Sequence, residues 1–246
     1  MGRLLTMLIA VICYFAFFLS FVYLVGFLAG IPQLPTHVDK GIVASTPIAV
    51  AVDLGLILLF GLQHSVMARP GFKAAWTRIV PQPLERAIYC LATALVLTAL
   101  YAFWHVLPQP IWHVENETGR IVLWAIFGLG FAIVFLSTWL ISHFELFGLS
   151  QAWSHLRGRE QRAHQFKTPL FYKLVRHPIY FGFFLALWAT PDMSLGHLIL
   201  AAGLSVYLYI GASYEERDLV GQFGYAYVSY QSRVGMILPG LGRKRT

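Results

Sequence analysis

LLTMLIAVICYFAFFLSFVYLVGFLAG, residues 4–30, is the most informative stretch of this chain for its fold. The stretch contains no charged residue, and as an α-helix it is long enough to cross a hydrocarbon core of about 30 Å. Arg3 in front of it resembles the start of a signal peptide. The run is too long for a signal hydrophobic region, however, and no small-residue cleavage site follows it cleanly. We therefore expect a retained first transmembrane helix.

Further apolar blocks follow at about residues 47–67, 84–106 and 119–147. Two shorter blocks, 178–190 and 195–213, are separated by Pro191, Asp192 and Ser194, which predict a tight helical hairpin. The first of them is short for a complete crossing. We expect an all-α, polytopic bundle of five to six membrane helices, with residues 1–246 forming a single membrane domain.

Composition agrees with a membrane protein. Hydrophobic residues make up 58% of the chain and charged residues only 12%, about half the charged fraction of a soluble domain. Cys13 and Cys90 both lie inside apolar blocks, so they predict neither a disulfide framework nor a metal site. The net charge of +7 raises the question of nucleic acid, but the basic residues lie between the apolar blocks and are explained by membrane orientation.

The orientation follows from the distribution of the basic residues. With the N-terminus inside, all of the 18 lysines and arginines except Lys40 and Arg120 fall on the inner side. Because positive residues favour cytoplasmic loops, we expect both termini in the cytoplasm, most simply in a bacterial inner membrane.

Ionisable residues inside the second apolar block need an explanation. Asp53, Ile57, Phe60 and His64 share one helical face, and His64 is flanked by Gln63 and Ser65. Ionisable groups inside a membrane are costly and often functional. The alternative is structural: Asp53 caps or pairs near the outer interface, and His64 is hydrogen-bonded near the inner one.

A second polar group follows the fourth block, where His143 and Glu145 lie near its inner end. A negative charge at a helix C-terminus opposes the helix dipole, so Glu145 is expected to have a cationic partner or ligand. A surface salt bridge with the arginines that follow is the alternative.

LVRHPIYFG, residues 174–182, predicts a helix that starts at Pro178. Arg176 and His177 then precede a helix N-terminus, which favours an anion, although a basic residue before proline is also common at a membrane boundary. Glu215 and Glu216 are expected at the C-terminus of the last span, where they need cations. Pairing with Arg217 or Arg233 is the structural alternative. Seven of the acids and bases map to the inner boundary, which suits a site for a cytosolic molecule with both an anionic and a cationic group: His64, His143, Glu145, Arg176, His177, Glu215 and Glu216.

The C-terminal half, about residues 165–240, resembles the isoprenylcysteine carboxyl methyltransferase-like superfamily of membrane methyltransferases. The resemblance rests on an ordered set of motif residues: Arg176, His177, Pro178, Tyr180 and Gly182; Glu215 and Glu216; Phe223, Gly224, Tyr227 and Tyr230; and Pro239. GLQHSVMARPGFK and HFELFGLSQAW in the N-terminal half are similar to the NnrU-like branch, and most closely to the methanethiol S-methyltransferases.

This resemblance implies S-adenosylmethionine bound at the cytoplasmic face by the C-terminal motifs and a small thiol as acceptor. Arg176 and His177 suit the donor carboxylate, Glu215 or Glu216 its ammonium or ribose hydroxyls, and Tyr180, Tyr227 or Trp188 its sulfonium. The cofactor-binding set is completed by Pro178. A base should help to form the thiolate; His64 is the first candidate, with His143 and His177 next. We expect Asp53, Gln63, Ser65 and Glu145 on the substrate side, and no metal.

Other functions remain open at this stage. The acceptor could instead be a lipid amine or an isoprenylcysteine carboxyl group. A transporter or channel with Asp53 and His64 along its path would need no methyl donor. A membrane haem protein is disfavoured, because no span carries two histidines at haem-ligand placement.

Overall fold

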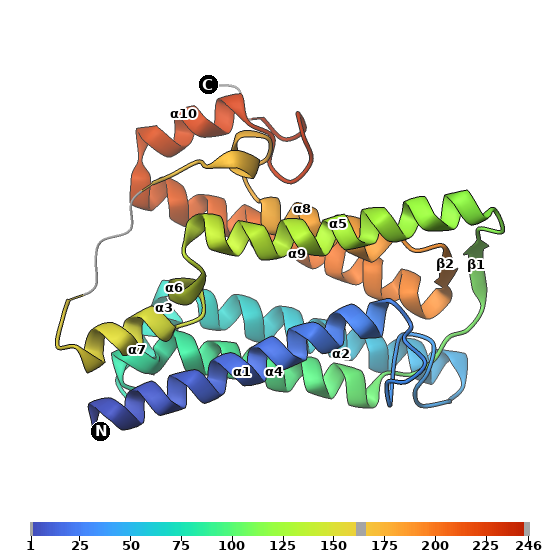
Figure 1. The fold of residues 1–246 in the computed structure, drawn as a ribbon, viewed down its shortest axis with the longest axis horizontal. Helices are drawn as coiled ribbons and strands as arrows, with labels where there is room; N and C mark the ends of the chain where they lie inside the picture. Colours follow the sequence, from blue (N-terminus) through green and yellow to red (C-terminus); the bar gives the residue numbers. More distant parts are fainter. Residues whose placement is uncertain (1, 161–165, 244–246) are drawn as a thin grey trace. The chain divides into compact units, whose positions relative to one another are not determined.

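The computed structural model describes residues 2–160 and 166–243. Within them the helices are α1 (Arg3–Leu28), α2 (Thr46–Ala68), α3 (Pro70–Trp76), η1 (Gln82–Leu84), α4 (Glu85–Phe103), α5 (Glu117–Ile141), α6 (His143–Leu146), α7 (Leu149–Leu156), η2 (Leu170–Lys173), α8 (Pro178–Trp188), α9 (Leu195–Phe223) and α10 (Tyr225–Arg233). Two short strands, β1 (Pro110–His113) and β2 (Asp192–Ser194), pair with each other (Figure 1). Arg162, Lys244 and Arg245, which contribute to the predicted charge asymmetry, lie outside the described residues.

Five helices of the described chain are long and apolar enough to cross a membrane: α1, η1 with α4, α2, α5 and α9. α8 is apolar but has only 11 residues, which makes it about 16 Å long. The prediction of a polytopic helical membrane protein is therefore confirmed.

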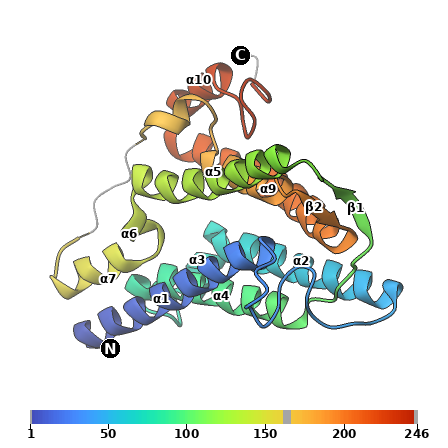
Figure 2. The same cartoon turned by 45° about the vertical axis from the view of Figure 1, so that its right-hand side comes forward.

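The chain divides into two compact units, the first formed by the described residues of Met1–Gln109, Ser142–Ala163 and Ser194–Leu200. In this unit α4 packs against both α1 and α2, and α7 packs against α1, as Figures 1 and 2 show. Small residues make these approaches possible: Ala10, Cys13, Ala87 and Ala152 are buried together. Gly148, between α6 and α7, has a φ of +88°, and a Cβ there would meet the Ala87 backbone nitrogen at 2.6 Å.

The second unit comprises the described residues of Pro110–Ile141, His164–Met193 and Ala201–Thr246. Its main packing is between α5 and α8, which lie side by side in Figures 1 and 2. The two helices meet at Gly130 and Gly182, where a Cβ on either residue would lie within 2.6 Å of the other's carbonyl oxygen. Close glycine contacts of this kind are typical of membrane helix pairs, where tight packing replaces the hydrophobic effect.

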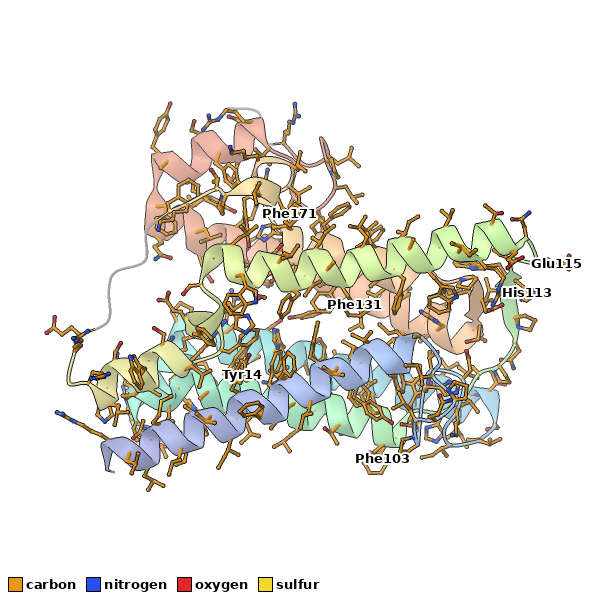
Figure 3. The ribbon with its side chains drawn as sticks, in the orientation of Figure 1. Tyr14, Phe103, His113, Glu115, Phe131 and Phe171 are labelled. Atoms are coloured by element: carbon orange, nitrogen blue, oxygen red, sulfur yellow. The ribbon has the colours of Figure 1, made fainter. Side chains whose placement is uncertain are left out.

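The β1–β2 pair was not expected from the sequence. Asp192 of β2 forms an ion pair with Arg120 of α5 (2.8 Å) and hydrogen-bonds the Nδ1 atom of His113, labelled in Figure 3 (2.5 Å). Arg120 and His113 together lower the pKa of the Asp192 carboxyl, chiefly through the arginine hydrogen bond. The turn of the predicted hairpin is thus a short strand tied to α5.

Two predicted span ends need correction. The fourth span ends at Ile141 rather than 147, because Ser142 is extended and a separate short helix, α6, follows. The last span continues to Phe223 instead of ending near residue 213. Glu215 and Glu216 therefore lie two turns inside α9, not at its C-terminus, so dipole repulsion does not explain their partners.

Candidate active site

The RHP motif is held against the end of the chain by backbone pairing. Val175 and Gly235 form a parallel bridge, and the backbone N–H groups of Arg176 and His177 donate to the carbonyls of Gly235 (2.8 Å) and Met236 (3.1 Å). Pro178 begins α8 and has no N–H. The amides of Arg176 and His177 are thus engaged within the protein, so an anion at this turn would have to find other donors.

The Arg176 guanidinium is entirely buried and bonded to the protein. Its Nε donates to Glu216, Nη1 to the carbonyls of Gln231 (3.1 Å) and Val234, and Nη2 to the carbonyl of Gly242 (3.1 Å). These contacts join α9, α10 and the C-terminal segment. A buried charge needs this degree of pairing, because its desolvation is expensive.

Glu216 is the carboxylate at the centre of this network, with its side chain 2% exposed. Besides Arg176, it accepts hydrogen bonds from Gln231 Nε2 (2.9 Å) and Tyr227 Oη (3.4 Å). His177 Nε2 lies 3.4 Å from the same carboxylate but makes no hydrogen bond in the described residues. Burial and the Glu216 charge raise the pKa of Tyr227, which keeps its hydroxyl a donor.

Glu215 occupies a different environment, because consecutive helical residues point about 100° apart. Its side chain is 45% exposed. It accepts a hydrogen bond from Tyr180 Oη (2.8 Å) and lies 3.6 Å from His177 Nδ1. The His177 ring is stacked parallel to Tyr180, with centroids 5.3 Å apart. The acid that faces outward is therefore Glu215, supported by Tyr180 and His177.

Aromatic packing holds α10 against the motif. Tyr230 donates its hydroxyl to the Tyr172 carbonyl, and Phe166 packs on Phe223, Tyr227 and Tyr230 at centroid distances of 5.3–5.8 Å. Burial raises the pKa of Tyr230 as well. The FGxxYxxY motif thus acts mainly as packing and hydrogen-bonding support for Arg176 and Glu216.

In the first unit, His64 lies on the face of α2 that packs against α4. Its Nδ1 atom is 3.2 Å from Thr93 Oγ1, and its ring contacts those of Phe60 and Tyr89, at centroid distances of 5.3 and 4.9 Å. Tyr89 also donates its hydroxyl to the His64 carbonyl (3.2 Å). The helical face predicted to bear Asp53 and His64 is thus the packed face of α2.

His143 is buried in α6 among aromatic side chains. Its Nε2 atom is 2.9 Å from the hydroxyl of Tyr14, labelled in Figure 3, and its ring contacts Phe144 and Phe147. Burial lowers the pKa of His143, because the charged imidazolium is poorly solvated there.

The residues expected on the substrate side are also in the first unit. Asp53 is fully buried; Oδ1 accepts the His105 backbone N–H (2.9 Å), and Oδ2 lacks a hydrogen-bond partner in the described residues. Gln63 donates to the Met67 sulfur (3.2 Å), and the Ser65 carbonyl accepts from Arg69 Nε (3.2 Å). The Glu145 carbonyl accepts from Gln151 (3.0 Å).

The seven expected cofactor residues, 176–178, 180, 215, 216 and 227, lie together in the second unit. The expected acceptor-side residues lie in the first. Three residues of these environments were not expected from the sequence: Gln231, Thr93 and Tyr14. Gln231 follows the last motif tyrosine and lies four residues after Tyr227, a spacing that could have revealed it. Among the described residues, no three His, Cys, Asp or Glu side chains are grouped to hold a metal ion.

The chain is similar over nearly its full length to curated methanethiol S-methyltransferases. It is 49% identical to that of a Pseudomonas species over 238 residues, which cover 97% of this chain and 91% of the relative. It is 43% identical to that of Crocosphaera subtropica over 99% of this chain and 95% of the relative, and 44% identical to that of Mycobacterium tuberculosis over 97% and 98%. Human nurim is a more distant relative, 29% identical over 82% of each chain. No protein-family model and no solved structure matches the chain.

Proposed function

The chain belongs to the methanethiol S-methyltransferase family, and from this premise we propose that it methylates methanethiol to dimethyl sulfide with S-adenosylmethionine as the methyl donor. The donor carries its methyl group on a positively charged sulfonium. When a thiolate sulfur forms a bond to the methyl carbon, the bond from that carbon to the sulfonium breaks and the donor sulfur leaves as a neutral thioether. The remaining task of the protein is to bind the donor, orient the thiol and remove its proton.

The observation that carries the proposal is the pair of adjacent glutamates with opposite environments. Glu216 and Arg176 form a buried network, while Glu215 is half-exposed and fixed by Tyr180. A fixed carboxylate suits the ammonium or the ribose hydroxyls of the donor, because it accepts charge-assisted hydrogen bonds. We therefore assign donor contact to Glu215, Tyr180 and His177. Arg176, Glu216 and Tyr227 hold these three in place.

We further propose that His64 accepts the thiol proton. A small alkyl thiol is mostly protonated at neutral pH, and the thiolate is the nucleophile. His64 is supported by its position on a membrane helix, where an ionisable group is costly without a role, and by its ring contacts with Phe60 and Tyr89. His143, hydrogen-bonded to Tyr14, is the second candidate.

The donor side is proposed to face the cytoplasm of a bacterium, with both termini on that side. The lysine and arginine distribution supports this orientation, since only Lys40 and Arg120 depart from it. An apolar helical environment also suits a product without charge, which can leave through the lipid.

The test is production of headspace dimethyl sulfide from methanethiol and methyl-labelled donor by the purified protein. Labelled dimethyl sulfide is the expected product, and its absence under conditions where the donor binds would overturn the assigned acceptor. A lipid fraction that becomes labelled instead would favour a lipid acceptor.

His64→Ala should lower turnover by about 10²–10⁴ with donor affinity nearly unchanged, because general base catalysis contributes on that scale. Activity should partly recover at high pH, where the thiolate forms without help. His113→Ala, which removes an exposed histidine from β1, is the matched control and should retain wild-type turnover. Full activity of His64→Ala near neutral pH would exclude His64 as the base.

A further inference from the structure

One face of α4 contacts the His64 imidazole and its backbone carbonyl. Thr93 Oγ1 lies 3.2 Å from His64 Nδ1, the Tyr89 hydroxyl donates to the His64 carbonyl, and the Tyr89 ring packs on the imidazole. Arg86 lies above the Tyr89 ring at 4.9 Å and donates its Nε to the Leu146 carbonyl (2.7 Å). Arg86, Tyr89 and Thr93 are spaced i, i+3 and i+7, so they share a single face of this helix.

The tautomer of His64 depends on the group to which the Thr93 hydroxyl donates its proton. Thr93 is 2% exposed, and its Oγ1 donates to the Tyr89 carbonyl at 3.0 Å. A hydroxyl has one proton and two acceptor lone pairs. When Thr93 donates its one hydroxyl proton to the Tyr89 carbonyl, its Oγ1 can only accept a hydrogen bond from His64. The contact with His64 is then a hydrogen bond only if Nδ1 carries a proton and donates it.

In the Nε2–H tautomer of His64, the two buried contacts of Thr93 Oγ1, with His64 Nδ1 and with the Tyr89 carbonyl, would share a single proton. A neutral imidazole that carries its proton on Nε2 presents a lone pair at Nδ1. Thr93 would then have to abandon the Tyr89 carbonyl, or the Nδ1 lone pair would face an oxygen lone pair. An unmade buried hydrogen bond is costly. The two distances therefore agree with the Nδ1–H form.

We propose that Thr93 is a positioning residue that holds His64 in the Nδ1–H tautomer, so that Nε2 is the atom that accepts the thiol proton. This rests on the proposed role of His64 as the base. In the step, the S–H bond breaks, its electron pair stays on sulfur and the proton forms a bond to Nε2. The resulting imidazolium keeps its Nδ1–H bond to Thr93, which stabilises the new charge.

The tautomer is measurable without any methyl acceptor. Protein labelled with ¹⁵N-histidine and placed in lipid bilayers gives solid-state NMR signals for its nine histidines. The His64 signals are those missing from His64→Asn. We expect a protonated Nδ1 and an unprotonated Nε2 at His64 in the wild type. A wild-type His64 that carries its proton on Nε2 would overturn the proposal.

Thr93→Val and Thr93→Ser form the matched pair of variants. Valine keeps the shape of the threonine side chain but removes the hydroxyl oxygen that accepts from His64, whereas serine retains this hydroxyl. Thr93→Val should move the His64 proton wholly or partly to Nε2 and lower kcat about three- to tenfold, the size of one lost hydrogen bond, with donor affinity unchanged. Thr93→Ser should keep the Nδ1–H signal and wild-type kcat. A Thr93→Val protein with the wild-type tautomer would refute the positioning role.

The proposal and the proposed function can fail separately. A wild-type protein that makes no dimethyl sulfide removes the function but leaves the NMR signals of His64 as measured. A protein that makes dimethyl sulfide with His64 in the Nε2–H form keeps the function and removes the role of Thr93.

Discussion

Glu215 and Glu216 are neighbours with the same side chain and opposite surroundings. Glu216 has its oxygens bonded to Arg176, Gln231 and Tyr227, and it is buried. Glu215 has one bond from Tyr180 and is half-exposed. A charge that is buried and paired contributes to the stability of the site, whereas a fixed and accessible charge is able to bind a ligand.

Replacing each glutamate with glutamine separates these roles. Glu215→Gln should weaken binding of S-adenosylmethionine roughly tenfold or more, because a charge-assisted hydrogen bond contributes about 1.5–3 kcal/mol. Its thermal stability should stay near that of the wild type. Glu216→Gln leaves the Arg176 charge buried without its partner, which typically costs about 3–5 kcal/mol, so its midpoint of thermal unfolding should fall.

Calorimetric donor titration and thermal unfolding of detergent-purified protein measure the two effects. Each variant serves as the control for the other. The reverse pattern, with a stable Glu216→Gln that does not bind and a Glu215→Gln that binds normally, would contradict the assignment.

Between elements, the close approach of α5 and α8 positions the motif. α8 begins at Pro178 and carries Tyr180 two residues before Gly182, the residue in contact with α5. The glycine of the RHPxYxG motif therefore has a packing role. Without it α8 would move away from α5, and Tyr180 would move with α8.

Gly130 and Gly128 of α5 provide a matched test of this contact. A Cβ on Gly130 would lie 2.6 Å from the Gly182 carbonyl oxygen, whereas a Cβ on Gly128 has nothing within 4 Å. Gly130→Ala should destabilise the protein by about 1–3 kcal/mol, as overpacking usually does. Gly128→Ala should be neutral or slightly stabilising, because alanine favours helix.

Thermal unfolding of the two purified variants checks this, and Gly182→Ala should behave like Gly130→Ala. A Gly130→Ala protein as stable as Gly128→Ala would show that the two helices separate without cost.

On the scale of the whole molecule, the charge distribution predicts the orientation in the membrane. Val43, between α1 and α2, is 82% exposed, and Ile79, between α3 and η1, is 80% exposed. Since the basic residues cluster around Ile79 and not around Val43, Val43→Cys should react with a membrane-impermeant maleimide in intact cells. Ile79→Cys should react only after permeabilisation.

The two native cysteines, Cys13 and Cys90, are buried, so they should give little background labelling. Labelling of the wild-type protein measures this background. Labelling of Ile79→Cys, but not of Val43→Cys, in intact cells would reverse the orientation and put Arg176 and Glu215 on the outer side.

Much of the fold was readable from the sequence, because hydropathy is summed along the chain and does not depend on tertiary partners. It located the membrane helices, and the 3.6-residue period put Asp53 and His64 on the packed face of α2. Boundaries set by single residues were less accurate. Ser142 interrupts an apolar run, and α9 continues past Ser213 through a polar segment in which Glu216 is buried.

The different environments of Glu215 and Glu216 could be seen only in the tertiary structure. The sequence identified Arg176, Glu215 and Glu216 as a set but left their roles open. Arg176 meets Glu216 from 40 residues away and Gly242 from 66, and His64 meets Thr93 from 29. Such partners are chosen by how helices pack, since a side chain's hydrogen bonds depend on what faces it in space. Residue types and their order indicated the chemistry, whereas packing determined which glutamate is buried and which is accessible.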